Sequence, residues 1–314
     1  MPSDREPHVS EGRSRVSARR AKPPAGVEVS RPDKLLWPSL EITKRAYVDY
    51  LGAVADAMVP WLRERPVTLV RAPDGVGGKQ YFQKAAPDYA PPWIRTVRIP
   101  APSAGRDVDY VVCEDRATLA WLGNQAVLEF HPAPVRVDML ERPDLLVVDI
   151  DPPEGAFDAA VEVSLLVLEV LDDLGIASGL KTTGGKGLHV VAPVERRYDA
   201  DELRRAASRL TAIVSGRRPE LVTDEFRKAK RQGRVMLDPS RNGTGATIVA
   251  PYSPRARPDG TVSFPLVPEE LGSTSPGEFT LDTVPGLLDR PGPRRWARLA
   301  AERRRIPAAL LRDA

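Results

Sequence analysis

The spacing of apolar residues along the chain predicts several amphipathic helices. In residues 41–62, "EITKRAYVDYLGAVADAMVPWL", apolar side chains recur every three or four positions, and Thr43 is suited to cap the start of a helix. Residues 157–175 and 199–215 show the same period, and Gly175 closes the first of them. These three segments are expected to cover a sheet, because each has one apolar face.

A less regular stretch, residues 117–131, is interpreted as a further helix. It reads "ATLAWLGNQAVLEFH" and is expected to end near His131. Its inner face would carry Leu119, Leu122 and Ala126. The stretch "TDEFRKAKRQG" at 223–233 predicts a short basic helix.

Short runs of apolar and β-branched residues alternate with these helices and predict strands. The stretch "SGLKTTGGKGLHVVAPV" predicts two strands joined by a glycine-rich turn, and "RVMLDPSRNGTGATIVAPY" predicts two more. Other strands are expected at 67–71, 79–84, 108–113 and 145–151. The pattern indicates a mixed α and β chain, an α+β protein in which residues 27–305 form one folded domain.

The two ends of the chain differ from this domain. Residues 1–26 are polar, and five basic residues follow one another there without an intervening acid, which predicts a disordered basic tail. Such a tail is either solvated or an arm that binds nucleic acid. Residues 306–314 are expected to form a short C-terminal tail.

Composition restricts the class of protein. The 314 residues are 42% hydrophobic and 28% charged, which is ordinary for a soluble globular protein. No apolar stretch is long enough to span a bilayer, so we expect a cytoplasmic protein without a membrane partner. A single cysteine, Cys113, excludes a disulfide framework and a thiolate zinc site. A net charge of +3 permits a nucleic-acid partner.

The first chemical signal is a pair of acids in "DLLVVDIDPPEG". Asp149 and Asp151 end an apolar run, and alternation along a strand places them on one face with Ile150 on the other. Two adjacent carboxylates stay ionised only when a cation shares their site. Solvated turn aspartates, glycosyltransferases and polymerases all fit the D-x-D motif, whereas Pro153 argues against haloacid-type phosphatases.

Two further stretches add candidate residues. In "KTTGGKGLHVV", glycines allow close backbone approach to an anion, and Thr183, Lys186 and His189 supply polar groups beside them. In "GRVMLDPSRNG", Asp238 ends another apolar run and Arg241 follows it. A third acid suits Mg²⁺ or Mn²⁺, which prefer oxygen ligands.

Five ordered stretches together resemble a known family. "PDKLLWP", "GKQYFQKAAPDYAPPW", "DLLVVDIDPPEG", "KTTGGKGLHVVAPV" and "GRVMLDPSRNGTGATIVAPYSPRAR" are similar to the polymerase domain of the bacterial end-joining DNA ligase D, in the archaeo-eukaryotic primase superfamily. The likeness runs from about residue 27 to about residue 300. It implies a primase-polymerase fold with two β-sheets around a catalytic cleft and flanking helices. The implied activity is template-directed nucleotide addition that fills gaps and extends DNA ends in non-homologous end joining.

The resemblance also implies roles for particular residues. Asp149, Asp151 and Asp238 match its catalytic acids, which hold two divalent ions, Mn²⁺ or Mg²⁺. Contacts to an NTP or dNTP are implied for His131, Thr183, Lys186, His189 and Arg241. Lys34 and Lys44 match the lysines that bind a DNA 5′-phosphate, and Tyr81 and Phe82 match an aromatic pair against the template base.

The residues around these positions support the nucleic-acid contacts. A lysine in the first turn of a helix, as expected for Lys44, opposes the helix dipole unless an anion lies beside it. In "KQYFQK", aromatic residues alternate with lysines, which suits base stacking, and one of Tyr81 and Phe82 is expected to be buried. Arg71, on a neighbouring strand, is a candidate contact to the template backbone.

Some features depart from the family. Thr183 stands where serine is usual, and Pro239 follows the third acid where an aromatic residue is common. The lysine motif K-x-D-G of ligases is absent, because "RAPDG" has alanine in its place. We therefore expect a stand-alone, nucleoid-associated polymerase that is a monomer and works with Ku and a separate DNA ligase. A metal-dependent glycosyltransferase and a non-catalytic DNA-end-binding module are the alternatives.

Overall fold

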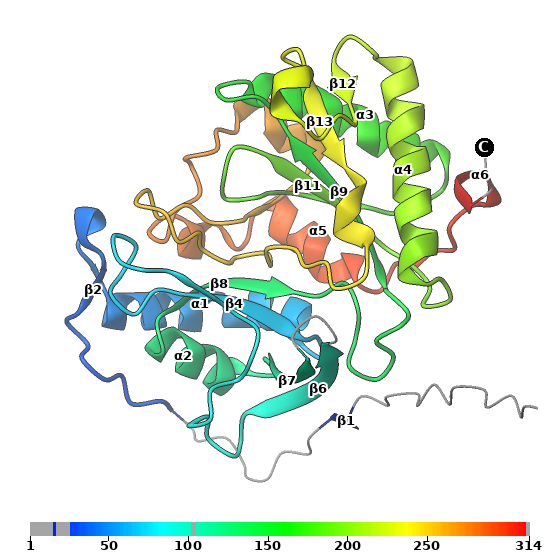
Figure 1. Ribbon diagram of the computed structural model, residues 1–314. Helices are drawn as coiled ribbons and strands as arrows, with labels where there is room; N and C mark the ends of the chain where they lie inside the picture. Colours follow the sequence, from blue (N-terminus) through cyan, green and yellow to red (C-terminus); the bar gives the residue numbers. More distant parts are fainter. Residues whose placement is uncertain (1–14, 17–25, 102–104, 312–314) are drawn as a thin grey trace, which may run out of the picture.

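The computed structural model describes residues 15–16, 26–101 and 105–311, and these form two sheets with helices around them (Figure 1). Most of the tail expected at 1–26 lies outside the described residues. Of that segment, Arg15–Val16 form strand β1, which pairs with strand β6 (Arg95–Ala101). Among the described residues, no helix is long and apolar enough to cross a membrane.

The first sheet has the strand order β1-β6-β7-β4-β5, and β8 also pairs with β4. Helices α1 (Lys44–Leu62) and α2 (Arg116–Asn124) share a hydrophobic core with it. A two-stranded ribbon, β2 (Leu35–Trp37) with β3 (Ile42–Thr43), precedes α1. The other strands are β4 (Val67–Arg71), β5 (Tyr81–Gln83), β6 (Arg95–Ala101), β7 (Arg106–Val112) and β8 (Val127–Pro132).

The second sheet has the order β12-β13-β9-β11-β10-β14. Its strands are β9 (Leu145–Asp151), β10 (Gly179–Thr182), β11 (Leu188–Pro193), β12 (Val222–Thr223), β13 (Val235–Asp238) and β14 (Pro265–Leu266). The helices around it are α3 (Phe157–Asp173), α4 (Ala200–Arg217), α5 (Pro291–Leu299) and α6 (Ala308–Leu311).

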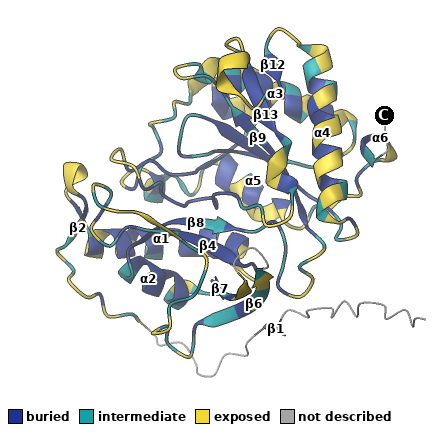
Figure 2. Cartoon of the chain, in the orientation of Figure 1, coloured by how far each residue is buried: buried dark blue, intermediate teal, exposed yellow. Residues whose placement is uncertain are grey.

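Alternation along β9 gives the second sheet two different faces. Leu146, Val148 and Ile150 belong to the main core, which also contains the apolar faces of α3 and α4. On the opposite face, Leu145 and Val147 pack with Trp61 of α1 and Trp296 of α5. Figure 2 shows β9 as a buried strand within this arrangement. The face shared with Asp149 and Asp151 therefore begins as a small apolar core and ends in carboxylates.

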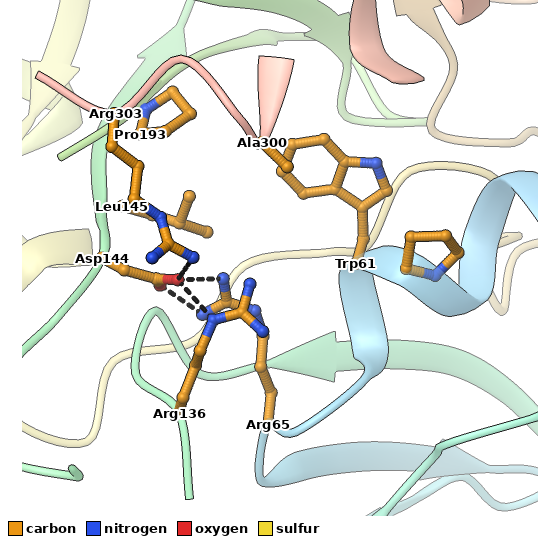
Figure 3. A pocket seen from close by; sticks show the side chains of 9 residues that line it. Trp61, Arg65, Arg136, Asp144, Leu145, Pro193, Ala300 and Arg303 are labelled. Atoms are coloured by element: carbon orange, nitrogen blue, oxygen red, sulfur yellow. Dashed lines mark hydrogen bonds and ion pairs between the residues drawn. The ribbon is translucent and has the colours of Figure 1, made fainter. Parts of the chain in front are cut away.

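A buried ionic cluster lies at the start of β9 (Figure 3). Asp144 accepts two hydrogen bonds from Arg65, at 2.6 and 2.9 Å, and one from Arg136 at 2.7 Å. Arg303 lies 3.6 Å from the same carboxylate. Arg65 and Asp144 are both about 2% exposed. Because Arg65 precedes β4 and Asp144 precedes β9, the cluster joins the two sheets.

Most of the expected helices and strands are present, with three differences. The helix expected over 117–131 ends at Asn124, and residues 127–132 form strand β8 instead. Ala126 separates the two elements with a positive φ of 56°, a conformation that stops a helix. The "VLEFHP" run that follows pairs with β4.

The second difference concerns the basic stretch at 223–233, which forms only a 3-10 turn at Lys228–Lys230. Third, the second strand expected in "RVMLDPSRNGTGATIVAPY" is absent, because residues 243–252 form no regular strand. Residues 248–257 form a segment that runs along β8 and donates backbone hydrogen bonds to it from Ile248 and Ala250. Residues 306–311, placed in a C-terminal tail by the sequence, pack onto the fold with Ile306 and Leu310 buried.

Candidate active site

Four polar side chains form a cross-strand row on one face of the second sheet. Lys181 of β10 pairs with His189 of β11, His189 pairs with Asp149 of β9, and Asp149 pairs with Asp238 of β13. Directly opposite residues in neighbouring strands have Cβ atoms about 4.5–5.5 Å apart, so the row is contiguous. Two of the predicted acids and the predicted histidine are thereby brought together, from segments up to 89 positions apart (149 to 238).

Each predicted acid is paired with a cation or imidazole of the chain itself. Asp149 lies 2.9 Å from Arg241 Nε and 3.4 Å from His189 Nε2. Asp151, two residues further along β9, contacts Lys186 at 3.0 Å and Arg231 at 2.7 Å. The oxygens that would bind metals are thus already surrounded by positive charge.

The third acid is held by its own turn. Asp238 accepts a hydrogen bond from the Ser240 backbone N–H at 2.8 Å, which fixes the carboxylate at the start of the turn that follows β13. Arg241, in the same turn, lies 3.9 Å from Asp238 and so stands between two acids of the row. The Asp-Pro-Ser-Arg sequence therefore places both an acid and its arginine.

Burial and charge perturb the titration of this row. Burial raises the pKa of Asp149, but His189 and Arg241 oppose this and hold it well below its usual range. Burial and the nearby Lys181 lower the pKa of His189 to about 4, against a partial opposing effect from Asp149. The Nδ1 atom of His189 is buried with no hydrogen-bond partner. His189 is therefore neutral at pH 7.

The lowered pKa of His189 predicts that the folded protein is less stable at acidic pH. The folded pKa of His189, about 4, lies below its ordinary value of 6.5. The unfolded state therefore binds more protons between these values, and stability falls as the pH falls from 6.5 toward 4. Relative to His189→Gln, the wild type should lose about 1 kcal/mol of unfolding free energy per pH unit in that window.

Urea unfolding of both proteins in metal-free buffer at several pH values measures this difference. Groups that titrate equally in both proteins cancel in the comparison. Parallel stability curves for the two proteins between pH 6.5 and 4 would show that His189 does not titrate as a buried neutral group.

The turn between β10 and β11 supplies the predicted phosphate hairpin, residues 183–187. Gly184 has a positive φ of 67°. At Gly187 an added Cβ would lie 2.3 Å from the backbone oxygen of Ile150, so only glycine lets this turn approach β9. The Thr183 hydroxyl bonds Gly187 O and accepts the Gly185 N–H. Lys186 bonds Pro152 O at 2.5 Å, beside the acids.

His131 lies on the first sheet rather than at the end of a helix. Its Nε2 atom is 2.7 Å from Glu129, two residues earlier on β8. Its ring centroid is 6.4 Å from that of Phe82 on β5. His131 therefore lies beside Phe82, one of the predicted template aromatics.

The expectation that one of Tyr81 and Phe82 is buried is wrong. Tyr81 is 45% exposed and Phe82 is 64% exposed. Both belong to β5, a three-residue strand at the edge of the first sheet, and its first two side chains, on opposite faces, are both exposed. Lys79 lies over the Tyr81 ring at 5.0 Å, and Arg71 pairs with Tyr81 across the strands. Two exposed rings with cations nearby are suited to stacking on single-stranded bases, whereas side chains of a hydrophobic core would be buried.

Lys34 and Lys44 are brought to one place at the start of α1. Lys44 is the first residue of the helix, and its predicted cap, Thr43, accepts the Ala46 N–H. Burial, then the charges of Lys34 and Arg31, lower the pKa of Lys44. Lys34 is paired with Asp74 at 2.8 Å. Three cations at a helix N-terminus form a site suited to a phosphate.

Four further residues at the site escaped the sequence-based reasoning: Lys181, Glu129, Arg231 and Arg255. Arg231 is 7% exposed and Glu129 is 6% exposed. Arg255 bonds Thr183 O of the phosphate hairpin at 3.0 Å. For the two arginines, the signal was the density of arginine in "FRKAKRQGR" and "YSPRAR", which does not single out any one side chain.

The acids have suitable chemistry for divalent metal ions. Three carboxylates offer the oxygen ligands that Mn²⁺ and Mg²⁺ prefer. Within the part of the chain that the structure describes, no group of three or more His, Cys, Asp or Glu side chains is already arranged to hold a metal ion. The donor set fits, and the ion pairs with Arg241, Lys186 and Arg231 must exchange before metals bind.

The fold and the site together define a primase-polymerase domain. The family model described as "LigD, primase-polymerase domain" matches residues 43–294. The chain belongs to this family. This confirms the resemblance to the ligase D polymerase domain and the predicted fold class.

Two LigD proteins are similar in sequence to this chain. The multifunctional non-homologous end joining protein LigD of Pseudomonas aeruginosa is 37% identical over 92% of this chain and 34% of its own length. The bifunctional LigD protein of Bacillus subtilis is 34% identical over 83% of this chain and 42% of its own length. The chain thus spans between about a third and two-fifths of the length of these relatives.

A solved structure has the same fold. The polymerase domain of Mycobacterium tuberculosis ligase D, in complex with DNA, superimposes with a TM-score of 0.81 at 30% sequence identity. The match covers 88% of this chain and 99% of that one. The shared fold therefore extends over nearly the whole of that polymerase domain.

Proposed function

We propose that this protein is a template-directed nucleotidyltransferase that fills gaps and extends DNA ends in non-homologous end joining. One observation carries the proposal. Asp149 and Asp238 meet on neighbouring strands, beside Asp151 and directly next to a glycine-rich hairpin that carries Lys186. Acids for metal ions next to a cradle for phosphates are what transfer of a nucleotide from a triphosphate requires.

In this proposal, Asp149, Asp151 and Asp238 hold two divalent ions, Mn²⁺ or Mg²⁺. When bound, such ions activate the primer 3′-hydroxyl and stabilise the charge of the leaving pyrophosphate. The arginine and lysine side chains that now pair with the acids become available to the triphosphate oxygens. Charge neutralisation by these groups is the main catalytic contribution of the protein.

The hairpin orients the nucleotide. Its backbone N–H groups and Lys186 bind the phosphates, while the Thr183 hydroxyl, held at 3.1 Å from Gly187 O, keeps the turn closed. Neutral His189 is a hydrogen-bonding group whose orientation Asp149 fixes. Since His189 is 5% exposed, it acts at the floor of the site rather than at its surface.

The first sheet receives the template. Phe82 and Tyr81 present exposed rings on which bases stack, and Lys79 neutralises backbone phosphates nearby. Arg71 donates to Gln125 O at 2.7 Å, which holds it beside this strand. The partners that the resemblance implies, Ku and a DNA ligase activity, belong to the same proposal.

Primer extension tests the proposal most directly. The substrate is gapped DNA with a 5′-phosphate at the far side, with Mn²⁺ and either ribo- or deoxynucleotides. The expected result is addition of the nucleotide complementary to the template base. Tight DNA binding without any addition would favour a non-catalytic end-binding module, and sugar transfer from a nucleotide sugar would favour a glycosyltransferase.

A separate prediction concerns recognition of the 5′-phosphate. Replacing both Lys34 and Lys44 with alanine should weaken binding to 5′-phosphorylated gapped DNA by roughly tenfold or more, since each surface phosphate contact contributes on the order of 1 kcal/mol. Binding to the same DNA with a 5′-hydroxyl should hardly change. Fluorescence titration of both DNAs at one salt concentration measures the difference.

A control replaces Lys228 and Lys230, two exposed lysines of the turn before β13. These should lower affinity for both DNAs alike if they contact the backbone at all. If the Lys34/Lys44 variant also loses affinity equally for both DNAs, the pair is an ordinary backbone contact and end recognition lies elsewhere.

A further inference from the structure

Glu129 is a buried carboxylate at the junction of the two halves of the site. It lies on β8 and is 6% exposed. One oxygen accepts the backbone N–H of Ala256 at 2.8 Å. The other lies 2.7 Å from His131 Nε2 and 3.1 Å from Arg255 Nε. The Arg255 contact is an ion pair without hydrogen-bond alignment.

A buried carboxylate is costly unless it is paired, so these contacts must offset its loss of water. Burial raises the pKa of Glu129, but the hydrogen bond to His131 and the charge of Arg255 outweigh this and lower it to about 2. Glu129 is therefore ionised at neutral pH. Its negative charge is shared between one side chain of each half of the site.

The partners of Glu129 point to different parts of the substrate site. His131 lies beside Phe82, on the side where the template is proposed to stack. Arg255 donates to Thr183 O of the phosphate hairpin. Its Cγ atom would lie only 2.8 Å from a Cβ at Gly184, so it packs directly against the turn. Glu129 is thus the common contact of a side chain near the template and a side chain on the hairpin.

The backbone strengthens this connection. The segment 248–257 runs along β8, with Ala250 N–H bonded to Phe130 O at 2.9 Å and Phe130 N–H bonded to the Ser253 hydroxyl at 3.0 Å. The Ala256 N–H then donates a hydrogen bond to the Glu129 carboxylate. Arg255 therefore reaches the hairpin from a segment that is bonded to β8 on both sides of this residue, at Ser253 and at Ala256.

We propose that Glu129 is a positioning residue for nucleotide binding, which holds His131 and Arg255 in the orientations that the triphosphate nucleotide requires. The proposal rests on the polymerase function proposed above. Because Nε2 of His131 contacts Glu129, the orientation of the imidazole ring is fixed. Because Arg255 is held at its Nε by Glu129 and at its terminal nitrogen by Thr183, its guanidinium plane is fixed beside the phosphates.

Glu129→Gln tests this with little change in shape. If the amide oxygen keeps the Ala256 N–H, the amide NH₂ faces Nε2–H of His131 and Nε–H of Arg255, where donor opposes donor. The KM for the incoming nucleotide should rise roughly tenfold or more, since hydrogen bonds and ion pairs to charged groups are lost. The kcat and the Kd for gapped DNA should change less than twofold, about the noise of such comparisons.

Glu270→Gln is the matched control. Glu270 is 8% exposed, accepts the Val267 N–H at 3.0 Å and pairs with Arg290 at 2.9 Å, which is the same combination of backbone and arginine contacts away from the site. Both variants should lose comparable melting temperature. Only Glu129→Gln should raise the nucleotide KM, and an equal KM in both variants would overturn the proposal.

A double-mutant cycle with His131→Gln shows whether Glu129 acts through its partner. If it does, Glu129→Gln should raise KM much less in the His131→Gln background than in the wild type. Fully additive effects would contradict positioning of His131. Should Glu129→Gln fail to fold, Glu129→Asp keeps the charge but shortens the reach, and an unchanged KM there would overturn the proposal as well.

The wild-type protein separates this inference from the proposed function. If wild type neither binds nor adds nucleotide, the polymerase function itself fails. If wild type extends primers and the Glu129 variants do so with wild-type KM, the function stands and the positioning role is refuted.

Discussion

Replacing Asp149 or Asp238 with alanine should abolish nucleotide addition while DNA binding persists. The expected loss of kcat is roughly 10³-fold or more, because several kcal/mol of charge stabilisation depend on ions that these acids would hold. DNA binding should survive because the proposed DNA contacts are distant in sequence from these acids. The contacts are the exposed rings of β5 in the first sheet, and Lys34 and Lys44, which precede β4 along the chain. Single-turnover primer extension and a DNA titration measure the two effects separately.

Asp158→Ala is a suitable control for these variants. Asp158 is an exposed acid in the first turn of α3, close in sequence to Asp151 but outside the cross-strand row. Its loss should leave primer extension unchanged within about twofold, as expected for a surface residue. Near wild-type extension by either the Asp149 or the Asp238 variant would refute the role of the acids.

The largest effect on stability is expected at the ionic cluster that joins the sheets. Asp144→Ala should lower the free energy of unfolding by about 3–5 kcal/mol, because Arg65 would remain buried without its counterion. Arg136 and Arg303 would add further positive charge around the empty position. Urea unfolding measures the change.

Two comparisons make the test specific. Asp138→Ala removes the carboxylate of a similar two-contact pair with Arg196, at 2.7 and 2.8 Å, but Asp138 is 61% exposed, so the loss should stay below about 1 kcal/mol. Replacing the pair itself, Arg65→Met with Asp144→Leu, should cost less than Asp144→Ala alone. Equal losses for Asp144→Ala and Asp138→Ala would mean that burial of the pair is unimportant.

The sequence identified the acids of β9 and β13 because each ends an apolar run, and alternation along a strand sets the faces of its side chains. The acids at 149 and 151 end an apolar run that is long enough to define a buried strand, and Asp238 ends another. Their faces followed from alternation alone. That Asp149 and Asp238 are direct neighbours did not follow, because pairing between β9 and β13 depends on the order of strands in the sheet.

The sequence was misleading where the structure depends on surroundings. "QAVLEFH" continues a helical pattern, yet Ala126 adopts a positive φ and the residues after it pair with β4. Tyr81 and Phe82 look half-buried by alternation, but both rings are exposed on the edge strand that carries them. Glu129 sits within an apolar run, and only the packing of residues 255 and 256 reveals that its charge is paired.

The position of the acids on β9 also restricts how the protein can misfold. Ile150, between them, packs against Leu188 and Leu237 in the neighbouring strands, and all three are fully buried. A slip of β9 by one residue during folding would turn Ile150 outward and force Asp149 and Asp151 into the apolar layer under α3 and α4. Burying two unpaired carboxylates costs several kcal/mol each, so such a slipped intermediate would be strongly disfavoured. The acids proposed for catalysis therefore also favour the correct register of β9 while the chain folds.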